Sequence, residues 1–196
     1  MHVFLGITGA SGAPYAARLL EALVAADCTV GVAASNAGIE VLATELHDDA
    51  SLPRDEVLAR LVEPLGGDVH VYDPVDWKAP YASGSARVDA YVICPCSMGT
   101  LASIAAGAMA NLIHRAGSVA LKEERKLVLV PRETPLSAIH LENMLRLRRA
   151  GATIVFAAPG FYHRPDTIDD LVDFLVARIL DQIGVENALA RRWGQR

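Results

Sequence analysis

The stretch HVFLGITGASGAP, residues 2–14, decides the fold class. It opens with a short and mostly apolar run, His2 to Thr8, that predicts a buried β-strand. The rest turns glycine-rich and ends at Pro14, which suits the first turn of a helix because its missing N–H needs no partner there. A strand that passes through such a turn into a helix is the opening unit of an α/β fold.

Further apolar runs of similar length follow along the chain and predict five more strands. They lie at Cys28–Ala34, Asp68–Tyr72, Val88–Cys94, Lys126–Val130 and Thr153–Ala158. Between most of them the apolar residues recur every three or four positions, which predicts helices. Continuous apolar strands separated by helices indicate a parallel sheet covered on both faces. We therefore expect a single doubly wound α/β domain, Rossmann-like or flavodoxin-like, with a six-stranded and mostly parallel sheet.

Size and charge exclude several classes of protein. The chain has 196 residues, of which 52% are hydrophobic and 21% charged, and its formal net charge is -5. This composition fits one well-packed domain and excludes a disordered chain. The acidic balance argues against a nucleic-acid surface, and no apolar run reaches the length of a membrane helix. The N-terminus lacks a basic leader, so we expect a cytoplasmic protein.

Cys28, Cys94 and Cys96 are the only cysteines, an odd number that gives no disulfide framework. The last two flank a proline, a spacing that could suggest a metal or redox site. A metal needs further ligands at matching spacing, and none stands nearby in the sequence. We expect packed thiols and no metal ion.

The residues that follow each strand are the candidate site, because ligands of such sheets bind outside the carboxyl ends of the strands. After the first strand, Gly9 to Gly12 permits a tight turn into a helix N-terminus, where free amides and the helix dipole favour a phosphate. Ser11 could add a hydroxyl donor. The spacing differs from the GxGxxG fingerprint, and a purely structural turn is the alternative.

Two other strands end in residues that suit a helix N-terminus. Ser35 and Asn36 follow the second strand and are good caps, which is their simplest interpretation. Ser97 to Thr100 follow the fourth strand with small and hydroxyl residues. This segment is a second candidate cradle of backbone amides.

An adjacent cation and carboxylate, Arg132 and Glu133, end the fifth strand. We expect Thr134 to cap the next helix and Pro135 to open it. Adjacent residues of an extended chain point to opposite sides, so we do not expect the charged pair to bond to each other. Two ordinary surface charges are the alternative.

Three further cations lie on predicted helices. Arg115 and Lys122 are seven residues apart and share a face if the helix continues through Gly117. A solvated face is the alternative for Lys122. Arg178 lies at the margin of the apolar stripe of the last helix, where it needs an anion or must reach water. We expect that stripe to contain Ile168, Val172, Leu175, Ile179 and Ile183, after a cap at Thr167.

Together these motifs resemble the flavin prenyltransferases of ubiquinone biosynthesis, formerly described as 3-octaprenyl-4-hydroxybenzoate carboxy-lyase partner proteins. The resemblance covers essentially the whole chain. It rests on GITGASGA, DW with ASGS, CPCSMGTL, NLIHR with LKEER, PRETPLSAIHLENM, FY and the final RWG.

The resemblance implies an enzyme that joins a dimethylallyl group from dimethylallyl phosphate to N5 and C6 of reduced FMN, without a metal. Prenylated FMN would then serve a partner decarboxylase, and a flavin reductase would supply reduced FMN. The assembly would be a homododecamer. The sequence leaves open whether the donor is a monophosphate or a diphosphate. It implies an FMN-binding domain over residues 1–184 and a tail over residues 185–196 that docks on a site or a neighbouring subunit.

The resemblance also assigns roles to residues. Glu133, Ser11 and Lys122 would be catalytic, with Glu133 handling the proton that the flavin loses. FMN would be held by Gly9, Ala10, Ser11, Ser35, Ser97, Met98, Gly99, Thr100 and Arg132. The prenyl phosphate and its isoprene pocket would be formed by Lys122, Tyr162, Arg178, Arg115, Trp77 and Trp193. Glu45 would contribute across a subunit contact.

The sequence departs from the family pattern at Ala110, where Asp is common, and at Gly117-Ser118, where Ala-Asp is common. These departures affect helix contacts and not the motifs at the strand ends. An FMN-dependent cysteine-type decarboxylase is one alternative, but its Pro-x-Met-Asn signature is missing. A non-catalytic flavin carrier is another, and it would not need Lys122, Glu133, Tyr162 and Arg178.

Overall fold

The structure is a computed structural model, and it describes residues 1–190 and residue 194. The described chain forms one six-stranded sheet in the order β3-β2-β1-β4-β5-β6, in which every neighbouring pair is parallel. This is the strand order of the Rossmann fold, and the direction of the order reverses between β1 and β4. The strands are β1 (His2–Ile7), β2 (Thr29–Ala34), β3 (Val69–Tyr72), β4 (Ala90–Cys96), β5 (Lys126–Pro131) and β6 (Thr153–Ile154).

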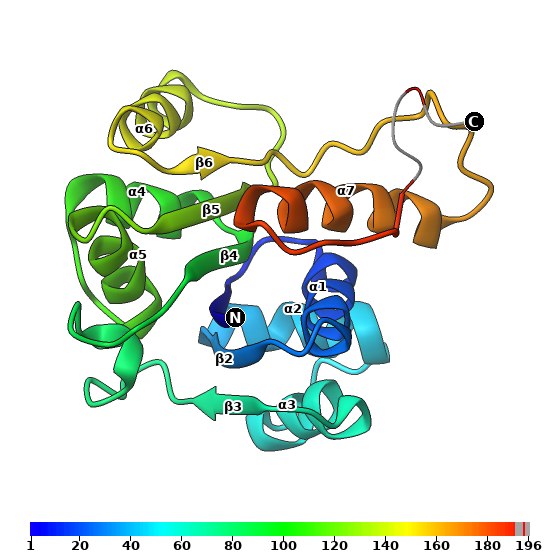
Figure 1. Ribbon diagram of the computed structural model, residues 1–196, viewed down its shortest axis with the longest axis horizontal. Helices are drawn as coiled ribbons and strands as arrows, with labels where there is room; N and C mark the ends of the chain where they lie inside the picture. The colour runs from blue at the N-terminus through cyan, green and yellow to red at the C-terminus, as the bar shows by residue number, and fades with distance from the viewer. Residues whose placement is uncertain (191–193, 195–196) are drawn as a thin grey trace.

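Helices cover both faces of this sheet (Figure 1). One face packs against α1 (Ala13–Ala25), α2 (Asn36–His47), α3 (Arg54–Val62) and α7 (Ile168–Ile183). The other face packs against α4 (Met98–Ala106), α5 (Leu112–Lys122) and α6 (Ala138–Arg149). Two short 3₁₀ helices, η1 (Glu63–Leu65) and η2 (Pro80–Ala82), lie in the connections on either side of β3. The predicted doubly wound α/β domain is confirmed.

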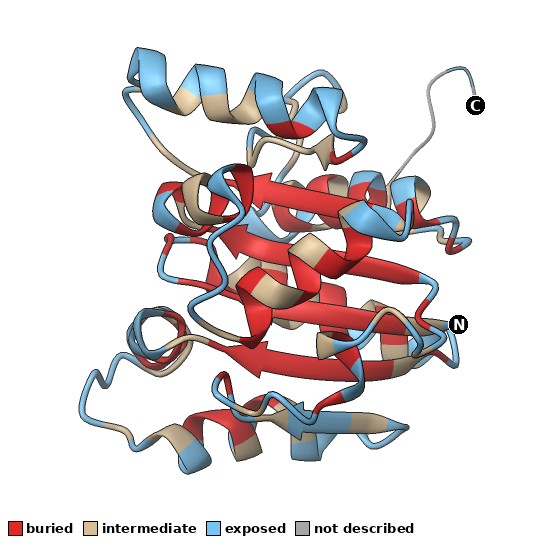
Figure 2. Ribbon diagram, turned by 90° about the vertical axis from the view of Figure 1, so that its left-hand side faces the viewer, coloured by how far each residue is buried: buried red, intermediate tan, exposed pale blue. Residues whose placement is uncertain are grey.

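Alternating residues of each strand supply the two cores. Val3, Leu5 and Ile7 of β1 belong to the core under α1 and α7, whereas Phe4 belongs to the core under α5. All four side chains are fully buried, as are the central strands in Figure 2. A strand buried on both faces must be apolar at every position, which is why the strands appear in the sequence as continuous apolar runs.

Two predicted elements differ from the structure. The sixth strand ends at Ile154 instead of Ala158, although the Val155 and Ala157 amides still donate to carbonyls of β5. β6 is the last strand of the sheet order, so its outer side has no neighbouring strand in the described chain.

The helix after β5 does not begin at Pro135. It begins at Ala138, and Ser137 is its cap because the Ser137 hydroxyl accepts a hydrogen bond from the His140 amide at 3.2 Å. Ile168 is also not part of the buried stripe of α7, since it lies in the first turn and is 75% exposed. The predicted cap at Thr167 is confirmed.

No helix of the described residues is both long and apolar enough to cross a membrane.

Candidate functional site

The candidate site lies at the carboxyl edge of the sheet, where the order of strands reverses. In open parallel sheets this reversal opens a crevice between the two strands concerned, here β1 and β4. The turns after β1, β2, β4 and β5 all reach this edge, so segments from four parts of the sequence meet there.

The turn after β1 packs directly against the start of α2. A Cβ atom on Gly9 would lie 2.4 Å from the Cβ of Ala37, and one on Gly38 would lie 2.5 Å from the Ile7 carbonyl oxygen. Only glycine permits this approach. It brings Ser35 beside the glycine-rich turn, where the Ser35 amide donates to Ile7 and its hydroxyl caps α2 by accepting from the Gly38 amide at 3.0 Å.

Glu45 occupies the helix N-terminus that the glycine-rich turn leads into. One oxygen of its carboxylate accepts from the Gly12 amide at 2.9 Å and from the Ala13 amide at 2.7 Å. A carboxylate is the expected partner of a positive helix end. A phosphate at this position would have to displace Glu45, which makes its contact within its own chain.

The N-terminus of α4 is open by contrast. Ser97 caps it, since its hydroxyl accepts from the Thr100 amide at 3.2 Å and donates to the Thr100 hydroxyl at 3.1 Å. Among the described residues, the Met98 and Gly99 amides have no acceptor, because the first turn of a helix lacks internal partners. Gly99 is exposed, and a Cβ there would meet nothing within 4 Å. These donors fit an anionic, flat ligand such as a flavin phosphate.

Arg132 and Glu133 lie at the same edge without pairing to each other, as predicted. The Arg132 guanidinium donates through Nε to the Ser11 carbonyl at 3.2 Å, which links the turns after β1 and β5. The Glu133 carboxylate accepts from the Thr134 amide at 3.0 Å. Both side chains are partly exposed, so each keeps polar atoms for a ligand.

Arg115 and Lys122 lie on α5, which is continuous through Gly117. A Cβ on Gly117 would lie 2.8 Å from Ile104, so the glycine permits close packing of α4 and α5. Arg115 donates to the Ala82 carbonyl at 2.8 Å, and Lys122 pairs with Glu123. A helix rises about 1.5 Å per residue, so Lys122 lies roughly 15 Å along α5 from its first residue, beside the start of β5. Lys122 is therefore at the amino end of the sheet.

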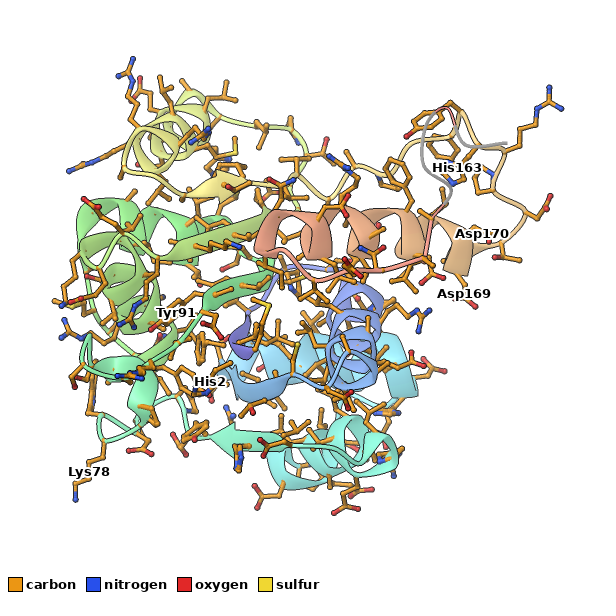
Figure 3. All side chains as sticks on the ribbon, viewed as in Figure 1. His2, Lys78, Tyr91, His163, Asp169 and Asp170 are labelled. Atoms are coloured by element: carbon orange, nitrogen blue, oxygen red, sulfur yellow. The ribbon has the colours of Figure 1, made fainter. Side chains whose placement is uncertain are left out.

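Tyr162 and Arg178 are associated with α7. The Tyr162 ring meets the Phe174 ring edge-on at 5.7 Å and is 61% exposed, and Arg178 pairs with Asp181 at 2.8 Å. Arg178 and Phe174 also line a cavity of about 320 Å³ between β6 and α7. His163, the neighbour of Tyr162, lies on the opposite side of the molecule from α5 (Figure 3). Within one chain, Tyr162 and Lys122 are therefore far apart.

The structure thus brings the predicted flavin-binding segments together but not the predicted phosphate-binding cations. Trp77 is half-exposed in the loop after β3, and Trp193 lies outside the described residues. A cavity of about 530 Å³ between α1, α2, α3 and α7 contains none of the predicted site residues.

The metal and thiol expectations can be examined within the described chain. No group of three or more His, Cys, Asp or Glu residues there could hold a metal ion. Cys94 and Cys96 are fully buried and unpaired, and burial raises the pKa of Cys96 to about 12. Neither thiol is available for chemistry.

Sequence reasoning missed one buried polar residue at this edge. Thr8 is 1% exposed, and its hydroxyl bonds to both Pro95 and Ser97. A hydroxyl residue at the end of an otherwise apolar strand was the signal that could have identified it.

Comparisons with known proteins show which proteins this chain is similar to. The chain matches the sequence model of the Flavoprotein family over residues 1–180. It is 52% identical to flavin prenyltransferase UbiX of Pseudomonas aeruginosa, across 99% of this chain and 94% of the relative. It is 51% identical to flavin prenyltransferase UbiX of Alkalihalophilus pseudofirmus, across 97% and 95% of the two chains.

Solved structures are similar over the full length. AnUbiX (PadA1), crystallised in complex with FMN and dimethylallyl pyrophosphate, matches 100% of this chain and 98% of its own, with a TM-score of 0.88 and 37% identity. A dodecameric FMN-dependent UbiX-like decarboxylase from Escherichia coli O157:H7 matches 100% of both chains, with a TM-score of 0.87 and 44% identity. The FMN-dependent cysteine decarboxylase TvaF shares the fold alone, with a TM-score of 0.62 and 16% identity.

Proposed function

Because the chain belongs to the Flavoprotein family and, within it, to the flavin prenyltransferases, we propose that it joins a dimethylallyl group from a dimethylallyl phosphate to N5 and C6 of reduced FMN. Reduced FMN supplies the electron-rich atoms for this reaction. The observation that carries the proposal is the open N-terminus of α4 beside Arg132 and Glu133, in a chain whose full-length relatives bear this name.

The flavin is held at the carboxyl edge of the sheet. The amides of Met98 and Gly99 are the free donors there, and Arg132 supplies a positive charge from the neighbouring strand end. The remaining proposed contacts come from the turns after β1, β2 and β4, namely Gly9, Ala10, Ser11, Ser35, Ser97 and Thr100.

Glu133 is the proposed general base. Its carboxylate lies at the flavin edge and forms no ion pair with Arg132, so it can accept the proton that flavin C6 loses. The exposed Ser11 hydroxyl of the opposite turn is the proposed partner in this proton movement.

Departure of the phosphate requires cations or donors that stabilise its developing charge. Arg115, Lys122, Tyr162 and Arg178 are the proposed donors, and no single chain brings all of them to the flavin edge. We therefore propose that neighbouring copies complete the site. The exposure of Lys122 and Arg178 and the dodecameric E. coli relative support this proposal.

The experiment for the activity is anaerobic incubation with reduced FMN and dimethylallyl monophosphate. Mass spectrometry should then find a flavin heavier by one prenyl unit, and a parallel reaction with the diphosphate identifies the donor. Unmodified FMN in both reactions would overturn the assignment.

A mixing experiment tests the shared site. Lys122→Ala and Glu133→Gln proteins should each be inactive alone. When the two proteins are unfolded together and refolded, activity should return. Some sites then combine Lys122 of one variant with Glu133 of the other. No recovery in mixed oligomers would place both residues of one site in one chain.

The partners and the tail are further proposals. A decarboxylase would receive prenylated FMN, and a flavin reductase would supply the reduced form. Residues 1–184 would form the flavin domain and residues 185–196 the docking tail. Val185 is buried and Leu189 packs on the core under α1, so the start of this tail already lies against its own domain.

A cysteine-type decarboxylase is not favoured, since TvaF shares only the fold.

A further inference from the structure

The ladder between β1 and β4 ends before the crevice begins. Its register runs from Val3 opposite Ala90 to Gly6 opposite Ile93. Beyond that point β4 is irregular, because its register with β5 shifts between Ile93 and Cys96. Pro95 also has no N–H to contribute to a ladder. Sheet pairing with β1 therefore does not fix the end of β4 that leads into α4.

Thr8 makes this connection instead. Its amide donates to the Pro95 carbonyl at 3.1 Å, and its hydroxyl donates to the same oxygen at 2.9 Å. The hydroxyl also accepts from the Ser97 amide at 2.7 Å. Thr8 is 1% exposed, so this hydroxyl uses its donor and an acceptor site within the protein and cannot reach a ligand.

The bonds continue from Thr8 into both flavin-binding turns. Ser97, whose amide it holds, is the cap of α4 and bonds through its own hydroxyl to the buried Thr100. In the other direction the Thr8 carbonyl accepts from the Ala10 amide at 2.9 Å. The side chain and the backbone of Thr8 therefore together link the Gly9–Ser11 turn to the segment that leads into α4.

We propose that Thr8 is a positioning residue for FMN: its buried hydroxyl holds the α4 amides in register with the β1 turn and so sets flavin affinity without touching the flavin. The inference rests on the proposed function for the identity of the ligand. Removal of a hydroxyl that only stabilises the interior would lower folding stability alone. Removal of a positioning hydroxyl would also lower ligand affinity, by more than a variant of equal stability does.

The test compares Thr8→Val, which keeps the shape and removes the hydroxyl, with Thr8→Ser, which keeps the hydroxyl. The Kd of oxidised FMN is measured by quenching of flavin fluorescence, with no prenyl donor present. Thr8→Val leaves the partly buried Ser97 amide without its acceptor, so we expect Kd to rise by about tenfold. Thr8→Ser should stay within about twofold of the wild type, as should the KM for the prenyl donor in both variants.

Tyr81→Phe is the matched control. It removes a hydroxyl that is equally buried and that bonds to His2 at 2.6 Å, but at the amino end of the sheet. It should lower the melting temperature as Thr8→Val does and leave the Kd of FMN unchanged. Equal losses of FMN affinity in Thr8→Val and Tyr81→Phe would overturn the inference, because general destabilisation would then explain both.

If Thr8→Val does not fold, Thr8→Cys replaces the hydroxyl with a weaker donor of similar size. Its Kd should lie between those of the wild type and the expected Thr8→Val value, and an unchanged Kd in the folded Cys variant would overturn the inference. The proposed function is tested independently of this inference. A wild-type protein that binds FMN but makes no prenylated flavin would refute the activity and leave the positioning role of Thr8 to be decided by Kd.

Discussion

At each end of the sheet, a buried side-chain hydroxyl joins segments that are distant in the sequence. At the carboxyl end Thr8 links β1 to the turn before α4, and at the amino end Tyr81 links η2 to His2. The two ends differ in whether polar groups are left without a partner. At the carboxyl end the Met98 and Gly99 amides have no acceptor in the described chain, whereas the Tyr81 hydroxyl and both ring nitrogens of His2 are paired.

Two sets of hydrogen bonds join segments at the amino end. His2 donates through Nδ1 to the Arg87 carbonyl at 3.0 Å, because a carbonyl can only accept. In the neutral ring its Nε2 then accepts from the Tyr81 hydroxyl. Arg125 donates to the Gly84 carbonyl at 2.7 Å and to the Tyr91 hydroxyl at 3.2 Å. His2 and Tyr91 are labelled near each other in Figure 3. Arg125 thus holds Gly84 in the loop after β3, and the donors without an acceptor in the described chain, the Met98 and Gly99 amides, lie at the opposite end of the sheet.

Glu133→Gln should have the largest effect. Loss of a general base costs about 10²–10⁴-fold in rate, so prenylated FMN should form far more slowly while the Kd of FMN stays nearly unchanged. Turnover is followed by mass spectrometry under anaerobic conditions. Asp89→Asn is the control, since this carboxylate accepts from the His2 amide at the amino end. Equal loss of turnover and of FMN binding in Glu133→Gln would remove its proposed role.

Gly31→Ala tests the amino end through stability. A Cβ on Gly31 would lie 2.0 Å from the hydroxyl oxygen of the fully buried Tyr81. Overpacking of this kind costs about 2 kcal/mol, which lowers the melting temperature of a chain of this size by about 4–8 °C. Tyr81→Leu should recover part of the loss in the double variant. A melting temperature equal to that of the wild type would show that the two ends do not differ in packing as described.

Gly99→Ala is the counterpart at the carboxyl end. Its Cβ would meet nothing within 4 Å, and alanine favours a helix by up to about 1 kcal/mol, so stability should be kept or raised. The added methyl group would occupy the approach to the free amides, and the Kd of FMN should rise by about tenfold. Thermal melting and flavin titration measure the two quantities. Unchanged FMN affinity would show that the first turn of α4 is not part of the flavin site.

The sequence predicted the fold well because apolar runs report burial. All six strands were located, five of them within a few residues of their bounds. The errors fall where burial gives no signal: the edge strand β6, and the start of α6, which depends on a bond between Ser137 and His140. Sequence spacing does not reveal such a local bond, since Thr134-Pro135 offers an equally suitable start.

The candidate site was predictable in part. Residues after the strands had to meet at one edge, so the cradle of Ser97 to Thr100 followed from topology. The location of Lys122 at the amino end of the sheet was not predicted, since its role came only from family resemblance, which does not say which copy supplies the residue. Glu45 could not be placed at the α1 N-terminus, because no local pattern links residues 33 positions apart.

His114 carries one of the buried polar atoms that have no partner in the described chain, and it gives the smallest expected effect. Its Nδ1 is buried without a partner in the described chain, on a helix packed against the core. Burial lowers the pKa of His114 below its usual range, because the charged ring would lose its hydration.

The sign of the pH effect follows from this shift. As pH falls through about 6.5, the unfolded chain binds a proton at His114 before the folded chain does, so folding stability falls. Above that pH this contribution is fully present and constant. His114→Leu should therefore reduce the loss of stability between pH 7.5 and pH 5.5, as measured by urea denaturation at each pH, while the Kd of FMN at pH 7.5 stays unchanged. An identical pH slope in the variant would mean that the ring is protonated at little cost in the folded state. His114 would then have an unrecognised partner in the folded protein.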